Sequence, residues 1–295
     1  MELRQLEYLV AVVDEGGFTK AANRLHVAQP GVSAQIRLLE RELGETLIDR
    51  SERTARPTEV GAAVLTHARA ALAAVRGVRQ AVDEFAGLVR GRVRIGTVTS
   101  HNIDVPGLLS EFHRRYPDVE ITLTESNSAH LIAALGSGDL DIAITGITAT
   151  PPPGLKVRML AEEPLVAAVP DGDPLARYDS VSLSKLVSRE LICLASGTAA
   201  RTSIEEACAA KGLSPKVAFE SGDPGLCARL AERGLGVAVL QKTIVDNRDG
   251  LRGIPIVRPS LRGWLVLGWR AEGPLSPAAR ELLRLARRRL PGLGD

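Results

Sequence analysis

Residues 18–43 read FTKAANRLHVAQPGVSAQIRLLEREL, and this stretch decides the fold of the N-terminal part of the chain. Apolar residues recur in it at the spacing of two short amphipathic helices with a tight break between them. They are Ala21, Ala22 and Leu25 in the first helix, and Val32, Ile36, Leu39 and Leu43 in the second. Pro30 suits the first turn of the second helix, where its missing N–H costs nothing. The pattern predicts a helix-turn-helix.

The second helix carries side chains suited to DNA on the face opposite its apolar stripe. From there Ser33, Gln35 and Arg37 can hydrogen-bond base edges or phosphates, as a recognition helix does in a major groove. The DNA-binding residues expected from this helix are Gln29, Pro30, Ser33, Ala34, Gln35 and Arg37. The plainer alternative is a two-helix hairpin in an ordinary globular core, which has the same apolar stripes.

Two flanking segments favour the DNA-binding interpretation. An apolar-rich helix over residues 3–13 can cover the hairpin, and residues 47–58 read LIDRSERTARPT, which predicts a short arginine-bearing hairpin. Three helices followed by a basic hairpin make a winged helix-turn-helix. Arg50 and Arg53 are expected to contact phosphates or the minor groove. Arg50 has an alternative role, because it could pair with Asp49 or Glu52 and only brace the wing.

Longer runs of this segment match a known family in order and spacing. They are MELRQLEYL (1–9), GGFTKAA (16–22), LHVAQPGVSAQIRLLE (25–40), Leu47 to Arg50, and Arg56-Pro57-Thr58 followed by Gly61. In these runs the N-terminal segment resembles the DNA-binding domain of LysR-type transcriptional regulators. Ile48 departs from the family's usual Phe, and Gly31 and Ala34 replace bulkier or polar residues. The departures affect the operator sequence that the helix would read and leave the mode of binding unchanged.

Charge alone does not indicate a nucleic-acid partner. Residues 1–58 hold eight Lys and Arg against nine Asp and Glu, a net charge of 8 − 9 = −1. A module that neutralises few phosphates gains affinity by using two or more copies. We therefore expect a homodimer or homotetramer on a dyad site in double-stranded DNA.

Composition and motifs exclude several other classes. No apolar run approaches the roughly 18–20 residues that span a bilayer, and the N-terminus lacks a signal pattern, so no membrane partner and a cytoplasmic location are expected. The three cysteines and five histidines have no metal-ligand spacing, so neither a metal nor a cofactor is expected. Nucleophile-elbow, phosphate-loop and dinucleotide motifs are absent from the sequence. A two-lobed α/β enzyme stays as the alternative from another class, although it would not explain residues 1–58.

Residues 59–90 predict one long helix between two domains. Thr58 can cap it, and a seam with three-four spacing runs along it through Val75, Val78, Val82, Phe85 and Val89. The family resemblance implies a linker helix that pairs two subunits antiparallel. The alternative is that the seam packs on the chain's own second domain.

Residues 91–295 alternate short apolar strands with helices, which predicts α/β lobes with parallel sheets covered by helices. The expected strands are 92–98, 119–125, 140–145, 165–169, 191–194, 216–220, 237–240 and 264–269, and the expected helices are 103–115, 128–136, 202–212, 224–233 and 277–290. Lobe I would comprise 91–162 and 269–295, and lobe II 163–268. This part resembles the family's effector domain, which has the fold of periplasmic binding proteins.

Ligands of open α/β sheets bind outside the carboxyl ends of strands, near helix N-termini. This rule selects loops with hydroxyl and amide side chains, which suit a small anionic effector. The proposed contacts are Thr99, Ser100, Asn102, Ser126, Ser196, Thr198 and Arg201. Arg201 could pair with a ligand carboxylate. The alternative for each single residue is that it only caps a helix or, for Arg201, covers its own domain.

One branch of the resembled family senses peroxide through two cysteines in the second lobe. Cys193 and Cys208 lie there, but Cys193 falls in the apolar strand 191–194 and Cys208 follows two glutamates. Buried thiols beside acidic residues are poor thiolates, so thiol sensing is the less favoured alternative. The main prediction is a DNA-binding transcriptional regulator that responds to a small molecule, with RNA polymerase as a further partner.

Overall fold

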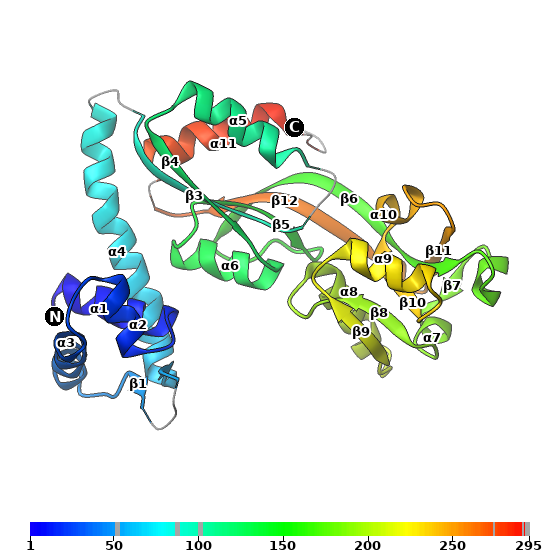
Figure 1. The fold of residues 1–295 in the computed structure, drawn as a ribbon, viewed down its shortest axis with the longest axis horizontal. Helices are drawn as coiled ribbons and strands as arrows, with labels where there is room; N and C mark the ends of the chain where they lie inside the picture. The colour runs from blue at the N-terminus through cyan, green and yellow to red at the C-terminus, as the bar shows by residue number, and fades with distance from the viewer. Residues whose placement is uncertain (51–53, 86–88, 100–102, 274, 291, 293–295) are drawn as a thin grey trace. The chain divides into compact units, whose positions relative to one another are not determined.

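The computed structural model describes residues 1–50, 54–85, 89–99, 103–273, 275–290 and 292. The chain forms two compact units (Figure 1). The first comprises Met1–Leu88 with Ser137–Asp139, and the second Val89–Gly136 with Leu140–Asp295. Among the described residues, no helix is long and apolar enough to cross a membrane.

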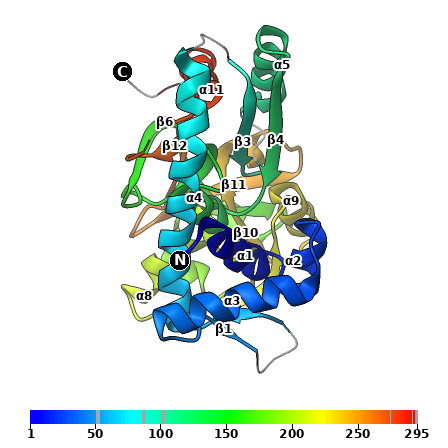
Figure 2. The same cartoon turned by 90° about the vertical axis from the view of Figure 1, so that its left-hand side faces the viewer.

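The first unit is a winged helix-turn-helix that continues into a long helix, as predicted. Its elements are α1 (Leu3–Asp14), α2 (Phe18–Arg24), α3 (Gln29–Leu43), β1 (Ile48–Asp49), β2 (Arg56–Pro57) and α4 (Glu59–Phe85). Helix α1 packs against α4, and α1, α2 and α3 pack against one another (Figure 2). Leu9, Ala21, Ile36 and Leu39 are fully buried in their shared core. Leu43 is an exception to the predicted stripe, since it is 41% exposed at the last position of α3.

A very close approach fixes α4 against the wing. A Cβ atom on Gly61 would lie 2.0 Å from the carbonyl oxygen of Leu47, so only glycine fits there. Thr58 caps this helix as predicted, because its Oγ1 accepts a hydrogen bond from the Gly61 N–H at 2.9 Å. The same hydroxyl donates to the Thr46 carbonyl at 2.7 Å, which ties the helix start to the loop before the wing.

The second unit has two lobes with separate cores (Figure 1). In the first lobe the parallel strands β3 (Gly91–Thr97), β4 (Val119–Glu125) and β5 (Ile142–Ile147) are accompanied by α5 (Val105–Arg115), α6 (Ser128–Ser137) and α11 (Pro277–Arg289). Ser276 caps α11, with its Oγ accepting from the Ala279 N–H at 2.9 Å. Phe112 and Leu282 lie in the core that α5 and α11 share with the sheet.

The second lobe is built around three further parallel strands. They are β8 (Leu191–Leu194), β9 (Val217–Ser221) and β10 (Val237–Gln241). The lobe also contains β7 (Val181–Ser182), β11 (Leu251–Val257), the 3-10 turn η1 (Pro174–Arg177), α7 (Leu183–Leu186), α8 (Ala199–Ala209), α9 (Pro224–Glu232) and α10 (Lys242–Asp246). The short elements β7, β11, η1, α7 and α10 were not predicted.

Two long antiparallel strands cross between the lobes and correct the prediction in two respects. Strands β6 (Leu155–Pro170) and β12 (Arg262–Arg270) pair along the whole of β12. The predicted parallel pairing is present within each lobe, but β6 and β12 pair antiparallel with their neighbours, and β11 pairs antiparallel with β6. The chain was predicted to return to the first lobe at residue 269. It returns earlier along the sequence, because β12 already pairs with β5 of the first lobe at Trp264.

Helix α4 leaves part of its predicted seam exposed in the single chain. Val75 is 44% and Val78 is 66% exposed, whereas Leu65 and Leu72 of the same helix are buried in the core of the first unit. The side chains of Val82 and Phe85 lie outside the described residues, and Val89 belongs to the second unit, beside its core. An apolar stripe on a long helix favours burial against a second helix.

We predict that replacing both Val75 and Val78 with Asp weakens self-association of the full chain, because burying two carboxylates in a helix pair is costly. Sedimentation-velocity ultracentrifugation measures the shift towards monomer. Thr66→Asp is the matched control, since Thr66 is exposed on another side of the same helix. An association constant that stays at the wild-type value in the double variant contradicts the prediction.

Candidate functional site

The exposed surface of α3 is the first candidate site. Pro30, Ala34 and Arg37 are exposed there, and Gln29 and Gln35 are half-buried. Gln35 Oε1 accepts a hydrogen bond from Gln5 Nε2 of α1 at 3.3 Å, which steadies the side chain at the surface. The surface of the helix therefore includes an amide, from Gln35, and a guanidinium, from Arg37. Both are groups that can hydrogen-bond DNA.

Ser33 does not lie on this exposed surface, contrary to the sequence-based prediction. It is only 7% exposed, and its Oγ accepts a hydrogen bond from Arg37 Nη2 at 2.9 Å. The reason is that α1 and α2 both pack against α3 and so bury a wider strip than its apolar residues mark. The Ser33 hydroxyl is thus paired with the Arg37 guanidinium of the same helix.

Glu40 connects the wing to α3. Its Oε1 accepts hydrogen bonds from the N–H groups of Leu47 at 3.0 Å and Ile48 at 3.3 Å. Its Oε2 pairs with Arg50 Nη2 at 2.9 Å, and the Arg50 guanidinium also lies 5.2 Å from the centre of the Phe18 ring. Arg50 is therefore tied to α3 through Glu40. Glu52, one of the two partners suggested by the sequence, lies outside the described residues. Arg53 lies outside the described residues.

The second candidate site is a cavity of about 710 Å³ between the two lobes of the second unit. It lies where the carboxyl ends of strands from both lobes meet, as the topology rule predicts. Polar and small residues at those ends line it, among them Thr99, Ser126, Gly146, Ala195, Gly222 and Gln241. Apolar side chains complete the lining, namely Val98, Leu194, Pro224, Ile244, Trp264 and Leu265.

The predicted ligand contacts fall into three groups. Thr99, Ser126 and Thr198 line the cavity. Ser196 and Arg201 are not among its lining residues. Ser100 and Asn102 lie outside the described residues.

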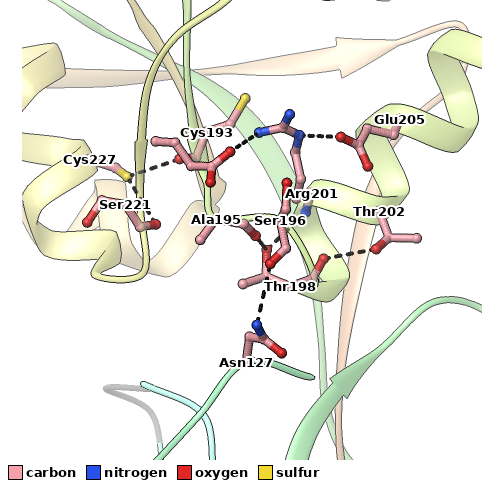
Figure 3. Close-up of polar contacts among 11 residues, drawn as sticks. Asn127, Cys193, Ala195, Ser196, Thr198, Arg201, Thr202, Glu205, Ser221 and Cys227 are labelled. Carbon is pink, nitrogen blue, oxygen red and sulfur yellow. Dashed lines mark hydrogen bonds and ion pairs between the residues drawn. The ribbon is translucent and has the colours of Figure 1, made fainter. Parts of the chain in front are cut away.

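Arg201 is held by two carboxylates of its own lobe (Figure 3). Its Nε pairs with Glu205 at 2.7 Å and its Nη1 with Glu220 at 3.0 Å. Neither glutamate lines the cavity, and the Arg201 side chain is only 12% exposed. The expectation that Arg201 meets a ligand carboxylate is thus replaced by its alternative, a role within its own lobe.

Helix caps occupy other polar groups at the cavity. Thr198 Oγ1 donates to the Ala195 carbonyl at 2.8 Å and accepts from the Arg201 N–H at 3.4 Å. Asn127 Oδ1 accepts from the His130 N–H at 2.9 Å, at the start of α6. The lobes also touch here, because the Ala129 N–H donates to the Gly197 carbonyl at 2.9 Å. Figure 3 shows Asn127 pointing at the Ser196–Thr198 loop.

Sequence reasoning missed the acidic side chains of this cavity. Glu125 ends β4, Glu163 lies on β6 where the strand crosses between lobes, and Asp223 caps α9. Glu125 ends the predicted strand 119–125 and Asp223 follows the predicted strand 216–220, so the same topology rule could have found them. Glu163 had no such signal, because residues 155–164 were not predicted as strand.

The three cysteines are free and buried in the second lobe. Burial raises the pKa of the Cys193 thiol to about 11, and burial likewise raises the pKa of Cys227 to about 11. Burial also raises the pKa of Cys208, and nearby Glu205 adds to the effect. The Cys227 thiol donates to the Cys193 carbonyl at 3.5 Å (Figure 3). These thiols are packed as small apolar groups and not as reactive thiolates.

Both parts of the chain match known families and proteins. Residues 3–62 match the bacterial regulatory helix-turn-helix proteins of the lysR family, and residues 86–291 match the LysR substrate binding domain. The chain is 28% identical to the DNA-binding transcriptional dual regulator OxyR of Escherichia coli K12, over 100% of this chain and 98% of that protein. It is 35% identical to the HTH-type transcriptional regulator ShiR of Corynebacterium glutamicum, over 81% and 82% of the two chains.

A solved structure has the same arrangement of elements. A full-length variant of OxyR from Pseudomonas aeruginosa covers 100% of this chain and 98% of its own, with a TM-score of 0.69 and 25% identity. The winged helix-turn-helix and the two-lobed second unit agree with the two family matches. The chain belongs to the LysR family of DNA-binding transcriptional regulators.

Proposed function

We propose that a small molecule bound between the two lobes controls how this regulator binds its operator. The observation that carries the proposal is the cavity of about 710 Å³, which is large enough for a small organic ligand. Strands β6 and β12 cross between the lobes beside it. A ligand that contacts both lobes favours one relative arrangement, and it alters DNA binding only if it binds that arrangement more tightly than others.

For the DNA-binding domain, we propose that α3 enters the major groove. Gln29, Pro30, Ala34, Gln35 and Arg37 would face the groove, with Ser33 supporting Arg37. Arg50 would brace the wing, and Arg53 keeps its proposed phosphate contact. A homodimer or homotetramer would place such helices on a dyad site, with RNA polymerase as a further partner. Since bacterial DNA lies in the cytoplasm, we place the activity there.

Thiol-based sensing is the second candidate, because relatives such as that of Pectobacterium carotovorum are named hydrogen peroxide-inducible genes activators. The burial of Cys193, Cys208 and Cys227 opposes it in this chain. A buried thiol with a raised pKa holds little thiolate near neutral pH, and the thiolate is the species that reacts with peroxide.

The assignment of α3 predicts different effects for two substitutions. Gln35→Ala should lower affinity for the selected operator by roughly 1–3 kcal/mol while leaving binding to unrelated DNA unchanged. Arg37→Ala should weaken binding to both DNAs and reduce the slope of log affinity against log salt by roughly 1. Fluorescence anisotropy at several salt concentrations measures both effects on operator fragments selected from random DNA.

Arg92→Ala serves as the control for these variants, because Arg92 is exposed in the second unit and pairs with Glu120. It should leave the salt slope at the wild-type value. If Gln35→Ala binds the operator as tightly as the wild type does, α3 does not read bases through this residue.

The cleft assignment predicts that filling the cavity abolishes the response to the effector. Ala161 lines the cavity, and Phe in its place would occupy ligand space. A compound found by screening a reporter gene behind the selected operator should raise the melting temperature of the wild-type protein. Ala161→Phe should lose this shift and the reporter response, yet bind the operator normally without compound.

Ala149→Phe is the matched control, since Ala149 is exposed and lies outside the cavity lining. It should keep the full response. If the Ala161→Phe protein still activates the reporter at the compound concentration that activates the wild type, the effector site lies elsewhere.

The burial of the thiols predicts slow labelling of the folded protein. A pKa near 11 in place of 9.0 leaves Cys193 and Cys227 with roughly a hundredfold less thiolate at pH 8. Iodoacetamide should therefore label them much more slowly in the native protein than in urea, as followed by mass spectrometry. Formation of a Cys193–Cys208 disulfide under micromolar peroxide would instead support thiol sensing.

A further inference from the structure

The outer face of α3 carries an apolar ridge. The ridge consists of Pro30, Ala34 and Leu38, which are spaced four residues apart and therefore lie in successive turns on one side of the helix. Pro30 and Ala34 are exposed, and Leu38 is 42% exposed. The opposite side of α3 faces the core of the first unit through fully buried residues such as Val32 and Ile36. The ridge therefore lies outside that core.

Two arginines border the apolar ridge. Arg37 and Arg41 are exposed on the same half of α3, and the ion pairs among the described residues include neither of them. The acidic residues of this stretch have partners elsewhere, since Glu40 pairs with Arg50 and Glu42 pairs with the N-terminal amine. An apolar ridge between two such cations fits the major groove of DNA, where phosphates form the walls and base edges form the floor.

Thymine is the base that offers an apolar group in the major groove. Apolar side chains recognise its C5 methyl group by direct contact, and neither Ala34 nor Leu38 has a group that could hydrogen-bond a base edge. Residues 1–58 hold more acidic than basic residues, so attraction to phosphates is weak and contacts to bases must supply more of the affinity.

We propose that Leu38 is a specificity-determining residue of this regulator. Together with Ala34, it packs against the methyl groups of thymines in the operator. The proposal rests on the proposed entry of α3 into the major groove, and it extends the reading surface by one helical turn beyond the residues assigned there. The continuity of the ridge from Pro30 to Leu38 supports it.

Replacing thymine by uracil in the operator tests this contact, because uracil lacks only the methyl group. Each thymine of a selected operator fragment is replaced in turn, and fluorescence anisotropy measures the affinity of the full-length protein. We expect at least one replacement in each half-site to weaken binding by about fourfold, as the loss of one buried methyl group implies. Because a methyl contact releases no counterions, this ratio should stay constant as salt is raised.

Substitution of Leu38 should remove the preference for thymine. Leu38→Ala should bind the uracil and thymine fragments equally, because the methyl group then has no aliphatic partner. Leu38→Met retains an apolar side chain of similar size and should keep the preference. Leu43→Ala is the matched control, since Leu43 is a leucine of the same helix with 41% exposure that lies five residues further on, on another side. It should show the wild-type ratio.

The proposal is overturned if no uracil replacement weakens wild-type binding, or if Leu38→Ala keeps the wild-type preference for thymine. Fragments with 7-deazapurines then separate this failure from that of the proposed function, because these bases lack the N7 acceptor in the major groove. If they weaken binding where uracil does not, α3 lies in the groove and only the thymine contact is wrong. If neither replacement weakens binding, the proposed placement of α3 is wrong as well.

Discussion

The pairing of two long strands is the constraint on which the second unit depends. Strand β12 pairs with β6 from Arg262 opposite Pro164 to Arg270 opposite Leu155, and the strands cross between two cores that are otherwise separate. Because each lobe is built on parallel strands, this crossing lets their carboxyl ends meet at one cavity. A contact between Ala129 and Gly197 then joins the lobes beside the cavity.

In the first unit, a few contacts fix the position of the wing. Glu40 accepts from the backbone of the wing and pairs with Arg50, while Thr58 and Gly61 hold α4 against the same hairpin. The wing therefore has a defined position relative to α3 although it has only two short strands. If α3 enters the major groove as proposed, a helix and wing held in place before binding lower the entropy lost on binding.

Much of this architecture could be predicted, because strong local patterns coincide with packing. The helix 3–13, the start of the long helix at residue 59 and the strands 119–125 and 191–194 were predicted correctly or to within one residue. The strand over residues 155–164 was not predicted, because charged residues such as Lys156 and Glu162 interrupt the apolar pattern of a strand with an exposed face. The burial of Ser33 was not predicted, because α1 and α2 pack across α3 only in the folded chain. The Arg201–Glu205 pair has i,i+4 spacing and could have been predicted, whereas Glu220 reaches Arg201 from β9 through folding. Pairing between distant segments likewise brought Glu163 to the cavity.

The central claim is that occupation of the cleft and operator binding are coupled. Isothermal titration of one cleft-binding compound into the full-length protein, with and without saturating operator DNA, tests it most directly. Coupling between sites is reciprocal, so the account predicts that operator DNA changes the compound's affinity by the factor by which the compound changes operator affinity. Equal affinity for the compound in the presence and absence of operator would contradict it.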